Sequence, residues 1–195
     1  MGVGRPLQYE PDAMLLAVMQ TFWQQGYDGT SMRDLLEATG LSKSSFYEAF
    51  SNKRDALERA LARYCDMVTV DLEGRLRIAP SALGFIEEVL TEAAAEVITT
   101  RAPRGCMIVN VATEFGARDA RIQALVTTAV GRVTNVFIAA VKHAQSDNEI
   151  GSDKDPKVLG RYLLASLSGL RTLVKAGSSH RALRDVVAVI MSALR

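Results

Sequence analysis

A chain of 195 residues, of which 48% are hydrophobic, is long enough to bury a core and form one or two compact domains. Its 23 Lys and Arg residues nearly balance 22 Asp and Glu residues, so a formal net charge of +1 gives no general attraction to nucleic acid. Two cysteines make no disulfide framework, and no uncharged run reaches the ~20 residues of a membrane span. With no signal peptide before the first expected helix, we expect a cytoplasmic protein without membrane contact.

Residues 1–10 lack a helical apolar period and are expected to form an arm. Within this arm Arg5 could reach a minor groove, and a plain tail is an equal alternative. Pro11 is typical of a helix start, and apolar residues at helical spacing then continue to Gly26. This pattern predicts a first helix that supports the two that follow.

Residues 31–53 predict two short helices joined by a tight turn. Ser31 can cap the first helix, since Asp34 can return its hydrogen bond as in a capping box. Gly40 can take the left-handed conformation that ends this helix, and Ser42 can cap the second. The expected helices span 32–38 and about 43–49. The pattern is that of a helix-turn-helix.

The second of these helices presents small and polar side chains on its surface. Phe46 and Phe50 are four residues apart and can both face inward. The other positions, Lys43, Ser44, Ser45 and Tyr47, offer donors that could meet phosphates and base edges in a major groove. A solvated surface helix is the alternative for so short a segment.

The segment 26–57 closely resembles the N-terminal DNA-binding module of the TetR family of bacterial transcriptional regulators. The resemblance rests on Gly-Tyr and Thr-Ser within 26–31, Gly-Leu-Ser at 40–42, Phe-Tyr at 46–47, Phe50, Lys53 and Leu57. It implies double-stranded operator DNA as a partner, contacted by Arg5, Thr30, Ser31, Ser42, Lys43, Ser44, Ser45, Tyr47 and Lys53. Glu48, an acid on the second helix, departs from the pattern.

Asn52 can cap a long helix whose apolar residues recur every three or four positions to about Ile78. At ~1.5 Å per residue it would span on the order of 40 Å, enough to connect DNA contacts with a distant ligand site. We therefore expect a helix-turn-helix domain with its arm over residues 1–51, and a ligand-binding and dimerisation domain over residues 52–195. The fold class expected is all-α, with about nine helices.

The later helices follow the same logic. Ser81 begins a helix that fades near Thr100, and the resemblance implies a short helix that starts at Cys106. Asp119 begins a longer helix to about Gln145. The polar, turn-rich run 146–155 is expected to be a loop.

The last 40 or so residues predict a helical hairpin that turns at Gly177. Leucines form one face of its first helix, and a second face of small side chains would let another helix approach closely. The residues expected at this contact are Ala165, Gly169, Thr172, Val186 and Ile190. The resemblance implies that the partner is the same hairpin of a second subunit, which would give a homodimer with a four-helix bundle.

No P-loop, HExxH, GxSxG or strand-following GxGxxG motif is present, so we expect no enzyme activity. His143 and His180 lie in different expected helices without metal-ligand spacing, so neither a metal nor a cofactor is expected. Two alternatives from other classes are a helical carrier or enzyme that binds a small apolar molecule, and a dimeric interaction adaptor.

A regulator also needs a pocket for a small-molecule effector, which the central helices could supply with polar anchors such as Asn110. For most such polar residues, solvation or a bond to a backbone carbonyl is the simpler explanation. Cys106 follows Arg104 at a helix start, where N–H groups and cations can stabilise a thiolate, and Lys175 is a possible neighbour. We expect a repressor that an effector, or an oxidant or electrophile acting on Cys106, releases from DNA. A packing cysteine is the alternative.

Overall fold

The computed structural model describes residues 10–195. Over these residues the chain forms nine α-helices and one short 3-10 helix, with no strand, which confirms the all-α expectation. The elements are α1 Pro11–Gln25, α2 Met32–Thr39, α3 Lys43–Ala49, α4 Lys53–Ile78, α5 Ala82–Thr99, α6 Met107–Phe115, η1 Gly116–Arg118, α7 Ala120–Ser146, α8 Pro156–Lys175 and α9 His180–Leu194. The short η1 was not expected.

The chain divides into two compact units, the first ending at Tyr64 and the second beginning at Cys65. The division falls within the continuous helix α4, so the first turns of α4 belong to the helix-turn-helix unit. The boundary that we expect between the functional domains, at residues 51 and 52, lies at the start of α4 and stays a prediction.

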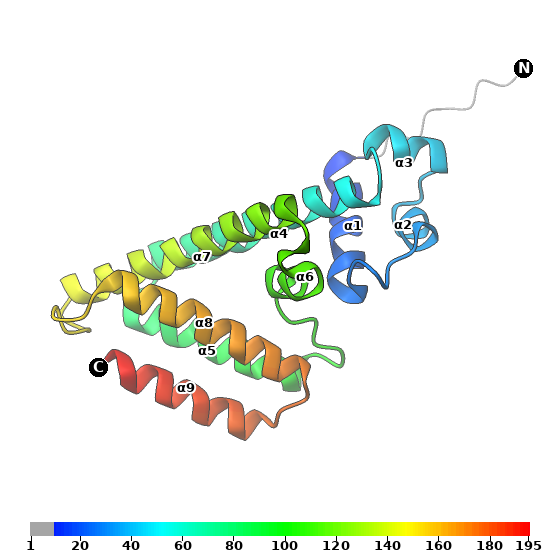
Figure 1. Ribbon diagram of the computed structural model, residues 1–195. Helices are drawn as coiled ribbons and strands as arrows, with labels where there is room; N and C mark the ends of the chain where they lie inside the picture. Colours follow the sequence, from blue (N-terminus) through cyan, green and yellow to red (C-terminus); the bar gives the residue numbers. More distant parts are fainter. Residues whose placement is uncertain (1–9) are drawn as a thin grey trace, which may run out of the picture. The chain divides into compact units, whose positions relative to one another are not determined.

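The first unit contains α1, α2, α3 and the start of α4 (Figure 1). Its core is made of large apolar side chains that are fully or almost fully buried: Val18, Met19, Phe22, Leu35, Phe46, Phe50, Leu57, Leu61 and Tyr64. The rings of Trp23 on α1 and Tyr64 on α4 meet edge to face, with their centroids 4.9 Å apart. This ring contact holds α1 against the start of α4.

The second unit is a layered helical bundle in which α7 packs along α8, while α5 contacts α7, α8 and α9 (Figure 1). The small side chain of Gly160 allows the close approach of α8 to α7, because a Cβ atom there would lie 3.1 Å from the backbone N of Ile138. At its other end α8 stops at Gly177, whose φ of 80° and the bond from Ser178 N–H to Leu173 O complete a Schellman turn.

By length and composition alone, α7 could cross a membrane. The lengths of the uncharged runs in the sequence did not indicate this. In the structure its apolar side chains Val133, Phe137 and Val141 are buried in the second unit. The buried share of the apolar window of α7 is 39%, so this part of the helix contributes to the core of the second unit.

The loop between α7 and α8 caps two other helices of the same unit. Glu149 accepts a hydrogen bond from the Leu83 N–H at 3.0 Å, at the start of α5. Bonds to Glu149 from the Ser81 hydroxyl and then from the Leu83 N–H hold the pKa of its carboxyl below 4.5. At the opposite polarity, the Lys154 ammonium donates to the carbonyl of Ala193, in the last turn of α9, and to the carbonyl of Arg195, which follows the helix. The Glu149 carboxylate thus lies at the start of α5, and the Lys154 ammonium lies at the end of α9. The helix dipole favours both placements.

We expect Glu149→Ala to destabilise the protein by about 1 kcal/mol at pH 7, the usual cost of a lost N-terminal cap, and to lower Tm by about 2–4 °C. The pKa of the Glu149 carboxyl is lower in the folded protein than its ordinary value. The stability that the charged carboxylate contributes is therefore fully present above the ordinary pKa, and it is lost as the pH falls through the folded-state pKa. The Tm values of the two proteins should therefore converge as the pH falls through the folded-state pKa of Glu149. Glu87→Ala, at an exposed position on α5, is the control. A gap between Tm values that persists in acid would contradict the role of the charge.

Candidate functional site

The turn before α2 is organised by a capping box. The Asp34 N–H donates to Ser31 Oγ at 3.2 Å, and the Ser31 N–H donates to Asp34 Oδ2 at 2.7 Å. The Ser31 hydroxyl, and then its N–H, hold the pKa of Asp34 below 3.8. Gly40 ends α2 with a φ of 68°, in the left-handed region that favours glycine. The expected caps and the turn between the helices are confirmed.

The helix α3 begins with a cluster of three serine hydroxyls. Ser42 Oγ accepts from the Ser45 N–H at 3.2 Å and lies 3.0 Å from Ser44 Oγ and 2.9 Å from Ser45 Oγ. This network fixes the hydroxyls at one end of the helix. Because Ser42 and Ser44 are exposed, their free lone pairs and protons face solvent, where a phosphate or a base edge could meet them.

The outer face of α3 is polar and open. Phe46 and Phe50 are both 0% exposed, so they face inward as expected. The exposed residues are Lys43, Ser44, Tyr47 and Glu48. A seven-residue helix with one buried edge and a polar outer edge has the form needed to enter a major groove.

Lys53 begins α4, shortly after the end of α3. Its ammonium nitrogen is 4.2 Å from the centroid of the Tyr27 ring, a cation–π contact that holds the side chain near the surface. Arg5, the expected minor-groove contact, lies outside the described residues.

Thr30 is the expected contact that the structure contradicts. Its side chain is 1% exposed, and its hydroxyl donates to the Gly26 carbonyl at 2.6 Å. Its backbone N–H is also engaged, by the Tyr27 carbonyl at 3.2 Å. Thr30 therefore shapes the turn between α1 and α2 and is not available to DNA.

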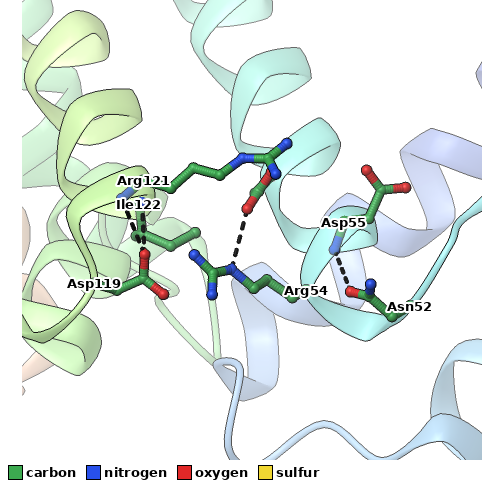
Figure 2. A network of polar contacts seen from close by, with 7 residues as sticks. Asn52, Arg54, Asp55, Asp119, Arg121 and Ile122 are labelled. Carbon is green, nitrogen blue, oxygen red and sulfur yellow. Dashed lines mark hydrogen bonds and ion pairs between the residues drawn. The ribbon is translucent and has the colours of Figure 1, made fainter.

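Local hydrogen bonds fix the start of α4 and, separately, the start of α7 (Figure 2). Asn52 Oδ1 accepts from the Asp55 N–H at 2.9 Å, which confirms the expected cap, and Arg54 pairs with Glu58 at 3.2 Å. In the second unit, Asp119 Oδ1 accepts from the N–H groups of Arg121 and Ile122, each at 3.1 Å.

The three expected sensor residues come together at the start of α6. Cys106 is the N-cap residue, partly exposed, and its side chain makes no capping bond. Asn110 Nδ2 donates to the Arg104 carbonyl at 2.9 Å, and the Lys175 ammonium donates to Asn110 Oδ1 at 3.3 Å. A Cβ atom on Gly105 would lie 3.4 Å from Lys175 Cδ, so Lys175 also lies against the residue before the cysteine.

Other polar side chains of the central helices bond to their own helices, as the simpler explanation supposed. The hydroxyls of Thr113, Thr128 and Thr134 each donate to the carbonyl four residues earlier. Among the residues that the structure describes, no group of three or more His, Cys, Asp and Glu side chains could hold a metal ion.

An apolar groove of about 510 Å³ runs between α8 and α9. It is lined by Tyr162, Ser166, Gly169, Leu170, Leu173, Asp185, Val186, Val189 and Ile190. Of the residues expected at the dimer contact, Gly169 and Val186 line the groove and are exposed, and Ala165 and Thr172 are exposed on α8. Ile190 is 4% exposed and contributes mainly to the core beneath the groove.

Sequence reasoning missed Tyr162, Leu173 and Val189 in this groove. Leu173 and Val189 are 42% and 67% exposed, and because both line the same groove they form part of one apolar patch. The sequence does contain a pattern that indicates this side of the groove. A second stripe along α8 repeats every three or four residues and consists of Tyr162, Ser166, Gly169 and Leu173.

A helix-turn-helix unit followed by a separate all-helical unit defines a DNA-binding transcriptional regulator. Residues 15–60 match the family described as bacterial regulatory proteins, tetR family, and residues 86–190 match the tetracyclin repressor-like C-terminal domain. The chain belongs to the TetR family, a family of regulators and not of enzymes.

Two curated relatives extend over most of the chain. One is YezE of Bacillus subtilis strain 168, an uncharacterized HTH-type transcriptional regulator, at 26% identity over 98% of this chain and 100% of that protein. The other is the HTH-type transcriptional repressor ComR of Escherichia coli K12, at 28% identity over 94% of this chain and 88% of that protein.

Solved structures share the fold. A cysteine-substituted form of the TetR family regulator CifR, complexed with 26-base-pair double-strand operator DNA, matches with a TM-score of 0.84 at 27% identity, covering 98% of this chain and 100% of that chain. The reduced form of E. coli NemR also has a TM-score of 0.84, covering 95% of this chain and 97% of that chain, and at 17% identity it shows the fold alone.

Proposed function

We propose that the protein is a cytoplasmic homodimeric repressor that binds double-stranded operator DNA through α3. The observation that carries the proposal is the open polar face of α3, held on a buried edge of two phenylalanines. It is supported by the similarity to ComR, which is named a repressor, and to CifR, which was solved on operator DNA.

The DNA contacts that we propose fall into two kinds. Ser31, Ser42, Tyr47 and Lys53 would bond phosphates and set the register of the protein, and Arg5 in the arm would reach the minor groove. Lys43, Ser44 and Ser45 would face base edges, since N-terminal residues of a recognition helix reach the groove floor. Two copies of α3 would enter successive major grooves, about one turn of DNA apart.

The groove between α8 and α9 is the dimer contact that we propose. Its exposed apolar side chains are suited to burial against the same hairpin of a second copy, related by a two-fold axis. Residues 1–51 would then carry DNA binding, and residues 52–195 ligand binding and dimerisation.

Release from DNA is proposed to follow from a change in the second unit. A small-molecule effector, or covalent modification of Cys106 beside Asn110 and Lys175, would favour a dimer geometry that no longer fits the operator. Such coupling typically amounts to about 1–3 kcal/mol. No membrane, metal or cofactor is part of this proposal.

The test is a gel shift on DNA that flanks the coding region of the protein, at several salt concentrations. We expect a saturable complex with this DNA that weakens as salt rises, and weaker binding to unrelated DNA. Equal binding to both DNAs, or none, would favour a carrier, an enzyme or an interaction adaptor instead.

Lys53→Ala is expected to weaken binding to all DNA sequences about equally, because an ammonium on a phosphate carries no base information. The slope of log K against log salt should fall by about one per subunit. Lys142→Ala, an exposed lysine on α7, serves as the control. An unchanged slope would remove Lys53 from the contact set. Lys43→Ala and Ser44→Ala should instead alter the preference among operator variants.

A further inference from the structure

Arg59 is an exposed cation on α4 that reaches back to α3. Its Nη1 donates to the carbonyl of Ala49, the last residue of α3. Its guanidinium also covers the ring of Phe50, with Cζ 4.6 Å from the ring centroid. One side chain therefore holds the end of the recognition helix by two independent contacts.

Both contacts suit the chemistry of a helix end. The last carbonyls of a helix lack intrahelical donors, and the helix dipole places partial negative charge there, so a cation is favoured. The ring of Phe50 lies 5.0 Å from the ring of Phe46, the residue that buries α3 in the core. The contacts therefore run from Arg59 through Phe50 to the anchor of α3.

A helix as short as α3 depends on such anchors. It has seven residues, and isolated helices shorter than about 12 residues are marginal in water. Its start is fixed by the Ser42 cap and its end by Arg59. Readout of base edges needs donors held to within about 0.5 Å, so a small tilt of α3 would misplace Lys43 and Ser44.

We infer that Arg59 is a positioning residue for operator recognition, an inference that rests on the proposed DNA-binding function. It acts through the orientation of α3 and not by touching DNA. Its Nη1 bonds the Ala49 carbonyl and its planar group covers Phe50, so both of these contacts act on the end of α3, and the salt slope tests whether a remaining N–H also meets a phosphate. Arg59 was not singled out in the sequence, because only the fold brings α4 back against the end of α3.

The experiment compares Arg59→Met, Arg59→Lys and Arg63→Met with the wild type. Arg63 lies one turn further along α4 and has no hydrogen bond or ion pair with any residue from 10 to 195. Arg63→Met therefore removes the same charge as Arg59→Met without removing such a contact. We measure Kd for the operator and for unrelated DNA at several salt concentrations, Tm, and hydrogen exchange of the amides of residues 46–50.

For Arg59→Met we expect a roughly tenfold loss of operator affinity, the size of one mismatched base pair, with nearly unchanged affinity for unrelated DNA and an unchanged salt slope. Amides 46–50 should exchange faster, Arg59→Lys should recover part of both effects, and Arg63→Met should match the wild type.

A salt slope reduced by about one per subunit would make Arg59 a phosphate contact and overturn the inference. Equal operator affinity of Arg59→Met and the wild type would overturn it too, even with a lower Tm. Since exchange is measured without DNA, absence of operator binding by the wild type would refute the proposed function alone, whereas unchanged exchange in Arg59→Met would refute the positioning role alone.

Discussion

Gly169→Leu is expected to turn the dimer into a monomer that no longer holds operator DNA. In one protomer, a Cβ atom at position 169 meets nothing within 4 Å, so no neighbour in the protomer clashes with the first carbon of a side chain there. The same side chain would project into the α8–α9 groove, and overpacking at a close helix contact costs roughly 1–3 kcal/mol or more. A two-fold axis would place two such leucines in one interface.

Gly131→Leu is the matched control, because Gly131 is an exposed glycine on α7 whose Cβ position is also open. Both changes should raise the helix propensity of the chain by up to about 1 kcal/mol. Only Gly169→Leu should change the sedimentation coefficient and the gel shift. Sedimentation of Gly169→Leu as an unperturbed dimer would show that this groove is not the interface.

Hypochlorite and N-ethylmaleimide are expected to release the wild-type protein from its operator and to leave the Cys106→Ser protein bound. The maleimide adds the Cys106 sulfur across its double bond, and hypochlorous acid converts a thiolate to sulfenic acid with loss of chloride. Either product adds bulk or polarity at the N-cap of α6, the helix whose Asn110 side chain accepts from Lys175. A gel shift titrated with each reagent measures the dose at which half of the complex is lost.

Cys65→Ser is the control for this titration. Cys65 is 3% exposed, and its sulfur lies 3.9 Å from the Thr69 hydroxyl, so reagents in solution have little access to it. Cys65→Ser should respond at the dose of the wild type. Release of Cys106→Ser at that same dose would return Cys106 to a packing role and leave a small-molecule effector as the proposed signal.

The sequence predicted best those features that depend on neighbours along the chain. Ser31, Ser42 and Asn52 cap their helices as expected, because a cap bonds N–H groups two or three residues away. The inward turn of Phe46 and Phe50 follows in the same way from helical spacing. Such rules need no knowledge of the remaining fold.

Features set by distant segments were not predictable in this way. Thr30 belongs to a sequence motif that implies DNA contact, yet the fold of the turn buries it. The covering of Phe50 by Arg59 depends on the path of α4, and the groove depends on the spacing of α8 from α9. The division inside α4 likewise reflects packing and not a break in the helix.

The charge on the outer face of α3 affects how many molecules a cell would need. That face has one cation, Lys43, and one acid, Glu48. Attraction to bulk chromosomal DNA depends on the number of phosphates that are neutralised, and a genome offers about 10⁶–10⁹ competing sites. On the DNA-binding role that we propose for α3, this helix would add little to the attraction to bulk DNA, and we expect few molecules to be lost to the chromosome. A small copy number would then suffice to keep a single operator occupied.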